Sequence, residues 1–266
     1  MDIKYIVLIL SFMRQIAILS WGEPLIMKFP TANVLGFNFL QTTQAQFLEQ
    51  LHTDLAAQQN RFVVTANPEI IMYAKKHPAY AEIIRQADYL VADGIGVVKA
   101  TQHTAVPLPE RVTGYELFEE LLRWGDAHHL RIYFLGSKPD VITQVIAKVN
   151  RQYPHVEVAG FHDGYFDDFA PIQTEIERTQ PAMVFVATGF PKQEEFIQKS
   201  RHLAPAIWMG IGGSFDVFAG AVKRAPQFWQ NHNLEWLYRL ITDPRRIKRQ
   251  IVLPVFMIKA WWANRK

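Results

Sequence analysis

The strongest constraint on the fold is the alternation of short β-branched runs with amphipathic stretches along the chain. Parallel strands need long crossover connections, and helices usually provide them. The pattern therefore predicts an α/β protein with a mostly parallel, Rossmann-like sheet flanked by helices. The predicted strands are Val34–Phe39, Arg61–Thr65, Tyr89–Ala92, Arg131–Leu135, Val156–Gly160, Met183–Ala187 and Ile207–Met209.

Polar and glycine residues stand at or directly after the ends of most predicted strands. In an open parallel sheet the carboxyl ends of the strands lie along one edge, and ligands bind in the crevice outside that edge. We therefore expect these residues to meet in one shared cleft. They are Thr65-Ala66-Asn67, Asp93-Gly94, Gly136-Ser137, Thr188-Gly189 and Gly210-Ile211-Gly212-Gly213.

Asp93 is the candidate catalytic residue. It follows an apolar strand and precedes Gly94 and Gly96, so its carboxylate should project from the sheet edge beside backbone that a substrate can approach closely. A carboxylate in that position suits a general base, which would take the proton of a sugar hydroxyl as a C–O bond forms. The alternative is a carboxylate that only structures a turn.

Asn67 and Arg111 are candidates for binding an anion. Asn67 precedes Pro68, a favourable first helical residue, so the sequence predicts a helix start with amide donors that can bind a pyrophosphate or a carboxylate. Arg111, in the loop after Pro109, can bind a diphosphate through two guanidinium N–H groups. The alternatives are capping alone for Asn67 and a solvated surface position for Arg111.

Further candidates lie near two other strand ends. Gln193, in the first turn of the helix predicted after Pro191, can hydrogen-bond a nucleobase or a sugar, or is an exposed polar side chain. Gly212 and Gly213 let a phosphate or sugar approach the backbone closely, and Asp216 can hold a hydroxyl.

Neither a cofactor nor a metal is expected. The third glycine of the G-x-G-x-x-G fingerprint falls on Phe215 in one glycine run and on Lys99 in the other, so a nicotinamide cofactor is unsupported. The chain has no cysteine, which removes thiolate zinc sites and cysteine nucleophiles. Asp163-Gly164 is a turn signal, and Asp167-Asp168 is adjacent rather than spaced as D-x-D.

Basic charge is concentrated near the C-terminus. Between Trp236 and Lys266 stand eight lysines and arginines and one aspartate, whereas the whole chain has a net charge of +3. Asp243-Pro244 predicts a helix start, and Trp261-Trp262 follows. A basic amphipathic element with tryptophans is typical of contact with an anionic membrane surface. A nucleic-acid groove is the alternative, but no recognition motif supports it, so no nucleic-acid partner is expected.

Several segments together resemble the WecB/TagA/CpsF family, also called glycosyltransferase family 26. The match is specific and runs in order from about Met27 into the tail. The matching segments are Thr65-Ala66-Asn67-Pro68-Glu69, Ala92-Asp93-Gly94-Ile95-Gly96-Val97-Val98, Glu110-Arg111-Val112-Thr113-Gly114, Gly210-Ile211-Gly212-Gly213-Ser214-Phe215-Asp216, Lys223-Arg224-Ala225-Pro226 and Leu234-Glu235-Trp236-Leu237-Tyr238-Arg239-Leu240.

The resemblance implies an inverting, metal-independent transfer of N-acetylmannosamine from UDP-N-acetylmannosamine to the C4 hydroxyl of N-acetylglucosamine on undecaprenyl diphosphate. It implies a peripheral protein at the cytoplasmic face of the cell membrane. By the same resemblance Asp93 matches the proposed base, Thr65, Asn67, Arg111, Gln193 and Asp216 match pocket positions, and Arg239, Arg246 and Arg249 match arginines thought to close over the diphosphates at the membrane.

The chain is expected to divide into an N-terminal extension of doubtful status (residues 1–26), a catalytic domain (27–235) and a basic membrane-associating appendage (236–266). The extension contains an apolar run, Tyr5 to Met13, that resembles part of a signal peptide. That run is far short of the roughly 20 residues that span a bilayer, and no clear cleavage site follows it.

Alternatives to this function remain open. The donor can carry a related sugar, such as N-acetylmannosaminuronic acid, for the same lipid carrier. A non-catalytic sugar-nucleotide-binding membrane module would keep the tail without transferring a sugar, and a nucleotide-dependent oxidoreductase is a more distant alternative. A homo-oligomer is compatible with the sequence.

Overall fold

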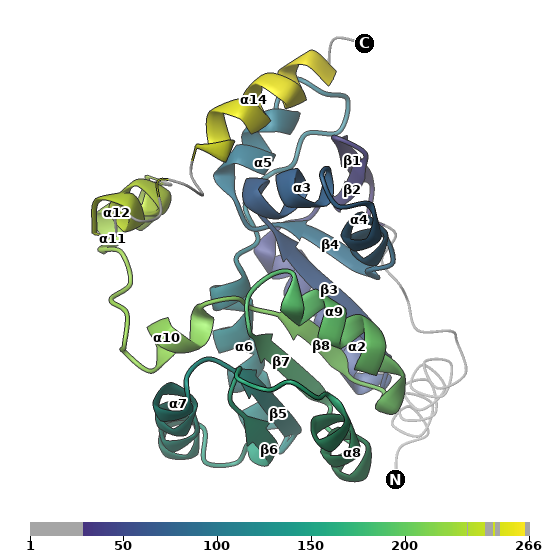
Figure 1. Cartoon of the computed structure of the whole chain (residues 1–266), viewed down its shortest axis with the longest axis vertical. Coiled ribbons are helices and arrows are strands. Elements are labelled where there is room, and N and C mark those ends of the chain that lie inside the picture. Colours follow the sequence, from purple (N-terminus) through teal and green to yellow (C-terminus); the bar gives the residue numbers. More distant parts are fainter. Residues whose placement is uncertain (1–28, 233, 243–246, 248–250, 264–266) are drawn as a thin grey trace, which may run out of the picture.

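The structure, a computed structural model, describes residues 29–232, 234–242, 247 and 251–263. Its centre is a parallel sheet of six strands in the order β4-β3-β8-β7-β5-β6, with helices on both faces (Figure 1). The predicted α/β class with a parallel, helix-flanked sheet is therefore confirmed. The strands are β3 (Arg61–Ala66), β4 (Tyr89–Ala92), β5 (Arg131–Gly136), β6 (Glu157–His162), β7 (Met183–Ala187) and β8 (Ile207–Gly210).

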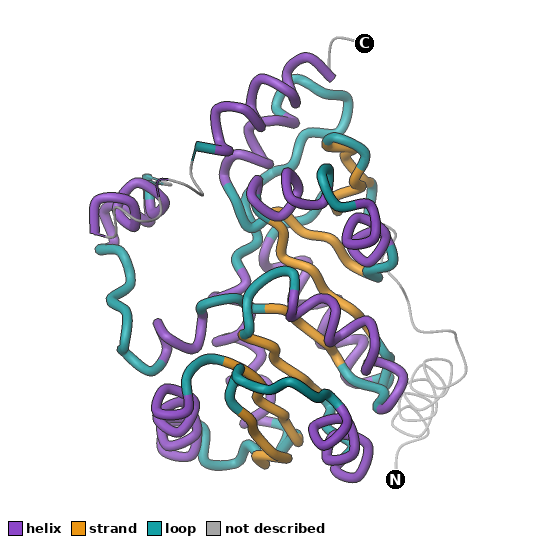
Figure 2. The backbone as a smooth tube through the Cα atoms, in the orientation of Figure 1, coloured by secondary structure: helices purple, strands orange, loops and turns teal. Residues whose placement is uncertain are grey.

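Strands β7 and β8, at the centre of the sheet, are apolar along their whole length because both faces of the sheet are buried. In β3, Phe62 and Val64 point into one core layer and Val63 into the other. Helices α3, α4, α5, α8, α9 and α14 cover the first face, and α2, α6, α7 and α10 cover the second (Figure 2). The helices are α2 (Gln44–Ala56), α3 (Pro68–Ala74), α4 (Pro78–Arg85), α5 (Ile95–Thr101), α6 (Gly114–Ala127), α7 (Pro139–Gln152), α8 (Ala170–Thr179), α9 (Lys192–Ser200), η1 (Arg201–Leu203), α10 (Ser214–Phe218), α11 (Gln227–Asn231), α12 (Glu235–Thr242) and α14 (Val252–Ala263).

Side-chain caps determine where two of these helices begin. The Thr43 hydroxyl accepts the Gln46 N–H at 3.2 Å, and the Gln46 side chain accepts the Thr43 N–H at 3.1 Å, which is a capping box for α2. The Asn67 side chain accepts the Ile70 N–H at 3.0 Å, and Pro68 is the first residue of α3. The predicted cap at Asn67 is therefore confirmed.

The single strand predicted for Val34–Phe39 is wrong. The segment is a hairpin of two antiparallel strands, β1 (Thr31–Val34) and β2 (Phe37–Leu40). Leu35 and Gly36 form its turn with φ angles of 53° and 89°, the left-handed pair that a two-residue hairpin requires. Leucine is not a turn-forming residue, so the pattern of apolar residues concealed the turn.

A buried carboxylate ties α2 to the starts of β3 and β4. Asp54 is fully buried and accepts hydrogen bonds from the Tyr89 hydroxyl at 2.7 Å and from the Gln50 side chain at 3.0 Å. The Arg61 Nε lies 3.3 Å from the Asp54 carboxylate. These contacts compensate the cost of burying the charge and anchor the two strands whose opposite ends carry the candidate site.

Helix α14 packs beside α3 and α5 on the first face of the sheet (Figure 1). Phe256 and Ala260 are buried and Val252 packs against the same core layer, a spacing of four residues that forms one stripe of the helix. Pro254 lies in the first turn of α14, where a missing N–H costs no helical hydrogen bond.

Candidate active site

The carboxyl ends of β3 and β4 bring three predicted site residues to one edge of the sheet. The parallel register pairs Ala66 with Ala92, so Asn67 and Asp93 follow at the same level beyond the strands. The Asp93 N–H donates to the Ala66 carbonyl at 3.1 Å, which extends the pairing by one residue. Thr65, the last but one residue of β3, lies at the same edge, and Asp93 is half-buried there.

Two glycines allow this close approach. A Cβ atom at Gly94 would lie 2.8 Å from the Pro68 Cδ and 3.3 Å from the Asn67 Cβ. A Cβ atom at Gly114 would lie 2.9 Å from the Thr65 hydroxyl oxygen. A side chain at either glycine would push its segment away from the end of β3. Gly94 and Gly114 therefore allow their segments to pack closely against the end of β3, beside the candidate base Asp93.

Arg111 lies beside the end of β4. The N–H of the next residue, Val112, donates to the Ala92 carbonyl at 2.8 Å. The Arg111 guanidinium lies 3.5 Å from the Glu235 carboxylate of α12, and the two side chains are only 18% and 13% exposed. This burial argues against the solvated surface alternative for Arg111. The ion pair also connects the site edge to α12.

Gln193 holds the glycine-rich turn after β8. It is buried, so the alternative of an exposed polar side chain is wrong. Its Oε1 accepts the Gly212 N–H at 3.0 Å, and its Nε2 donates to the Glu194 carboxylate at 2.6 Å. The Thr65 hydroxyl donates to the Gly210 carbonyl at 3.4 Å, which joins the same turn to the end of β3. Contact of Gln193 with a nucleobase or sugar stays a prediction.

Asp216, in α10, meets the end of β5. The Ser137 hydroxyl donates to the Asp216 carboxylate at 3.1 Å. Ser137 has a φ of 61°, a left-handed conformation that is uncommon for a residue with a side chain. The sequence pattern placed Gly136-Ser137 at a strand end but assigned the hydroxyl no role. The sequence feature that could have pointed to Ser137 is its place directly after Gly136, the glycine that ends β5.

Comparison with known proteins identifies the family to which the chain belongs. Residues 32–266 match the model of the glycosyl transferase WecG/TagA/CpsF family. The chain belongs to this family. The resemblance indicated by the sequence segments is confirmed, and the protein is a glycosyltransferase.

Two relatives cover most of this glycosyltransferase. A Bacillus spizizenii protein is 43% identical over 229 residues, 85% of this chain and 89% of the relative. A Staphylococcus aureus protein is 42% identical over 238 residues, 88% of this chain and 93% of the relative. Both relatives are named N-acetylglucosaminyldiphosphoundecaprenol N-acetyl-beta-D-mannosaminyltransferase.

The glycosyltransferase also buries a carboxyl group that the sequence pattern did not single out. Glu194, in the first turn of α9, is 1% exposed. Burial raises the pKa of Glu194 to about 7, and the hydrogen bond from Gln193 opposes that rise. Burial also raises the pKa of Tyr80. The polar segment around Glu194 gave no sign of this burial, because the neighbouring Lys192 and Glu195 are typical surface residues.

We expect Glu194 to make stability depend on pH. Between about pH 4.5 and 7 the folded protein holds a proton that the unfolded chain has lost, so the free energy of unfolding should fall as pH rises through this window. Glu194→Gln has no titrating group and should lack this contribution. Urea denaturation of both proteins across that pH range measures the difference, and parallel pH profiles would contradict the expectation.

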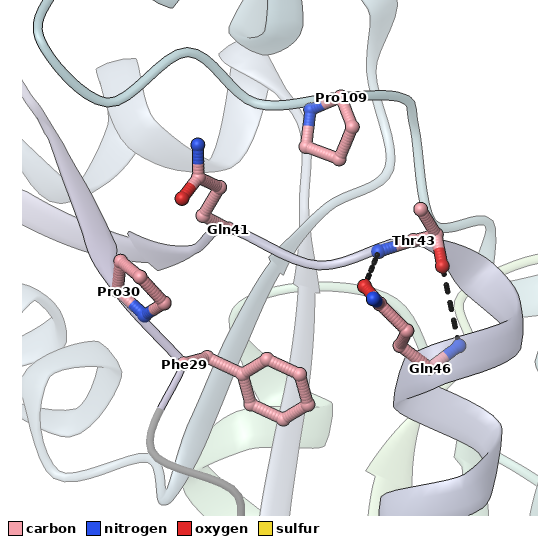
Figure 3. Close-up of a pocket in the computed structure, with 6 residues that line it drawn as sticks. All are labelled: Phe29, Pro30, Gln41, Thr43, Gln46 and Pro109. Carbon is pink, nitrogen blue, oxygen red and sulfur yellow. Dashed lines mark hydrogen bonds between the residues drawn. The ribbon is translucent and has the colours of Figure 1, made fainter.

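A shallow groove lies between the β1–β2 hairpin and the start of α2 (Figure 3). It is lined by Phe29, Pro30, Gln41, Thr43, Gln46 and Pro109. No predicted site residue lines this groove, and its polar groups are partly used by the capping box of α2. We therefore assign the candidate active site to the carboxyl edge of the sheet.

Within the described ranges, no group of three or more histidine, aspartate or glutamate side chains is arranged to hold a metal ion. The acidic segment after β6 forms a turn, in which the Asp163 side chain accepts the Tyr165 N–H at 2.7 Å. The turn predicted at Asp163-Gly164 agrees with this geometry.

The predicted tail arginines are only partly within the structure. Arg239 lies on α12, while Arg246 and Arg249 fall outside the described residues. Ile247, Ile251 and Val255 are exposed, whereas Phe256, the next residue of α14 after Val255, is buried against α3 and α5. In the part of the chain that the structure describes, no helix has the length and apolar character to cross a membrane.

Proposed function

We propose that this glycosyltransferase moves N-acetylmannosamine from UDP-N-acetylmannosamine to the C4 hydroxyl of N-acetylglucosamine-diphospho-undecaprenol, with inversion. The names of the relatives support this substrate pair. The observation that carries the proposal is the meeting of Asp93, Asn67 and Thr65 at the carboxyl edge of β3 and β4. The product would serve teichoic acid linkage-unit synthesis or the synthesis of a related cell-surface polysaccharide.

Asp93 acts as the general base in this proposal. Its carboxylate takes the proton of the acceptor C4 hydroxyl while that oxygen forms a bond to the sugar C1. The C1–O bond to the diphosphate breaks, and its electron pair leaves with UDP. A single displacement from the opposite face inverts C1. A positioned base of this kind contributes about 10²- to 10⁴-fold in rate.

The remaining site residues bind the substrates and stabilise the leaving group. The Arg111 guanidinium donates two N–H groups to the diphosphate, whose negative charge grows as the C1–O bond breaks. Gly212 and Gly213 let the donor approach the backbone, while Thr65, Asn67, Gln193 and Asp216 hold polar groups of the substrates. Arg239, Arg246 and Arg249 close over the diphosphates when the tail meets the membrane. No step requires a metal ion.

The direct test is a transfer assay with purified full-length protein, UDP-N-acetylmannosamine and a lipid-diphosphate N-acetylglucosamine acceptor. We expect UDP release and a product heavier by one N-acetylhexosamine residue, with equal rates in the presence of EDTA and of Mg²⁺. Mass analysis identifies the product. Absence of product with this pair, while the protein binds UDP, would reject the substrate assignment.

A related donor sugar is the second candidate. The roles proposed above do not distinguish a hydroxymethyl group from a carboxylate at C6 of the donor sugar. The same assay with UDP-N-acetylmannosaminuronic acid separates the two donors. A protein that binds UDP-sugars and transfers none of them would instead be a binding module.

We further propose that α14 contacts an anionic membrane surface at the cytoplasmic face. Its stripe of Val252, Phe256 and Ala260 packs on the domain, while the opposite side of the helix remains apolar and exposed. An apolar helix surface beside basic residues is suited to the headgroup boundary of a bilayer. The exposed residues are Met257, Ile258, Trp261 and Trp262.

The double substitution Trp261→Ser and Trp262→Ser should weaken binding to vesicles that contain anionic lipid by about tenfold or more, because each indole loses apolar burial. The side chains are 50% and 63% exposed, so the melting temperature should stay close to that of the wild type. Vesicle co-sedimentation measures binding. Tyr165→Ser, which removes a 70% exposed aromatic side chain near β6, is the matched control. Unchanged sedimentation of the double variant would refute the membrane role of α14.

A further inference from the structure

The buried carboxyl group of Glu194 lies one residue from a predicted substrate-binding side chain. Both residues are in the first turn of α9, and they are 4% (Gln193) and 1% (Glu194) exposed. No salt bridge to Glu194 is present among the described residues. Its neighbours are the Gln193 carboxamide, at 2.6 Å, and the Tyr80 hydroxyl of α4. Glu194 therefore contacts Tyr80 of α4 on one side and Gln193, at the active-site edge of the sheet, on the other.

The contacts of Gln193 define the orientation of its carboxamide. The NH₂ group of Gln193 donates to a carboxyl oxygen of Glu194 at 2.6 Å, so the Gln193 oxygen faces the other way. That oxygen accepts the Gly212 N–H at 3.0 Å. If the acceptor at position 194 were lost, the carboxamide could rotate and present its NH₂ group to the Gly212 N–H. Two donors would then face each other.

The glycine-rich turn leaves the Gln193 carboxamide little room. A Cβ atom at Gly210 would lie 2.6 Å from the Gln193 Nε2. Gly212 has a φ of 53°, and the turn leads directly into α10, which carries Asp216. A shift of the carboxamide is therefore transmitted to the backbone of Gly210 through Gly213. This is the segment at which the donor is expected to approach the backbone.

Burial of Glu194 costs folding free energy, because a carboxyl group without a cationic partner is unfavourable in a protein interior. An apolar side chain of similar length would pack at the same place without that cost. The carboxyl group supplies what an apolar side chain cannot, which is an acceptor for the Gln193 NH₂ group. Its position thus points to a role in the site rather than in packing.

We propose that Glu194 is a positioning residue that sets the orientation of the Gln193 carboxamide and thereby holds the Gly210-Ile211-Gly212-Gly213 turn in the form that receives the nucleotide part of the donor. The inference rests on the proposed function, because it requires that this turn binds a UDP-sugar. Glu194 itself does not touch the substrate.

The test compares two substitutions of similar length in the full-length protein. Glu194→Gln keeps an acceptor oxygen for Gln193 and should leave the Kd for UDP within about threefold of the wild type. Glu194→Met removes the acceptor and should raise that Kd, and the KM for the donor, by about tenfold, the value of one buried hydrogen bond. The change in kcat at saturating donor should be small. Calorimetric titration with UDP and donor-dependent kinetics give these values.

A double-mutant cycle separates positioning from packing. If Glu194 acts through Gln193, Glu194→Met should have almost no further effect on the UDP Kd in a Gln193→Met background. Glu194→Asp, which keeps a carboxyl group but withdraws it from Gln193, should weaken UDP binding more than Glu194→Gln does. This comparison holds even if Glu194→Met fails to fold.

Three results would overturn the inference. The first is normal UDP binding by Glu194→Met, and the second is an equal loss in both Gln193 backgrounds. The third is tighter UDP binding by Glu194→Asp than by Glu194→Gln. Failure of the wild-type protein to bind UDP at all would reject the proposed function, and this inference with it, so the two failures are distinguishable.

Discussion

Asp93→Asn is expected to lower kcat by about 10²- to 10⁴-fold while the Kd for UDP stays within about twofold of the wild-type value. The amide cannot take the proton of the acceptor hydroxyl, yet it has nearly the same shape as the carboxylate. The backbone hydrogen bond from Asp93 to Ala66 does not depend on the side chain, so the strand ends should keep their positions. Single-turnover kinetics with saturating donor and acceptor give the rate, and calorimetry gives the Kd.

Asp163→Asn is the matched control for this result. Asp163 also directly follows a strand of the parallel sheet and is half-buried, but its carboxylate accepts a backbone N–H within a turn. An asparagine can accept the same hydrogen bond, so kcat should change by less than about threefold. Near-normal turnover of Asp93→Asn would remove Asp93 as the base, and a rate loss of equal size in Asp163→Asn would point to a general effect on this edge of the sheet.

Gly136→Ala is expected to destabilise the protein by about 2–6 kcal/mol, the sum of backbone strain and overpacking. Gly136 has a φ of 130°, and a Cβ atom there would lie 2.4 Å from the Ala187 carbonyl carbon. Two parallel strands, β5 and β7, would have to separate where the Ser137–Asp216 hydrogen bond is formed. Much of the 5–15 kcal/mol stability of an ordinary domain would be lost.

Urea denaturation measures this change, and Gly189→Ala provides the control. Gly189 also has a left-handed φ, 76°, but no atom lies within 4 Å of a Cβ built there. Its substitution should therefore cost only the conformational term, about 1–2 kcal/mol. Equal destabilisation by the two substitutions would show that the contact with Ala187 is unimportant.

The strands of the central sheet were predictable because each is a short apolar run that ends at a glycine or a polar residue. The boundaries of β4 and β7 agree with the prediction, and those of β3, β5 and β8 differ by one residue at the carboxyl end. The sheet edge carrying Asp93 and Asn67 followed from the parallel topology alone. The pattern of apolar residues did not reveal the hairpin turn at Leu35. An apolar leucine continues a strand-like pattern, so nothing in that pattern marks a turn with a positive φ.

Side-chain environments at the site were less predictable. Gln193 and Arg111 both had surface alternatives. The structure buries Gln193 against Gly212 and half-buries Arg111 against Glu235. Glu194 and Ser137 were not candidates. Their partners, Tyr80 and Asp216, are more than 75 residues away in the chain, so local patterns carry no information about these contacts.

The sequence by itself determined the fold class, the family and the set of polar residues at the carboxyl edge, because these depend on local periodicity and on short segments that stand next to strand ends. Only the tertiary structure decided which faces of those segments are buried. Phe256 packs against α3 and α5 while Trp261 and Trp262 of the same helix stay exposed, and Glu194 lies in the interior although it follows a polar helix start. The reason is that burial depends on which elements meet in space, and an apolar helix surface or a single carboxyl group acquires its role only from the element packed against it.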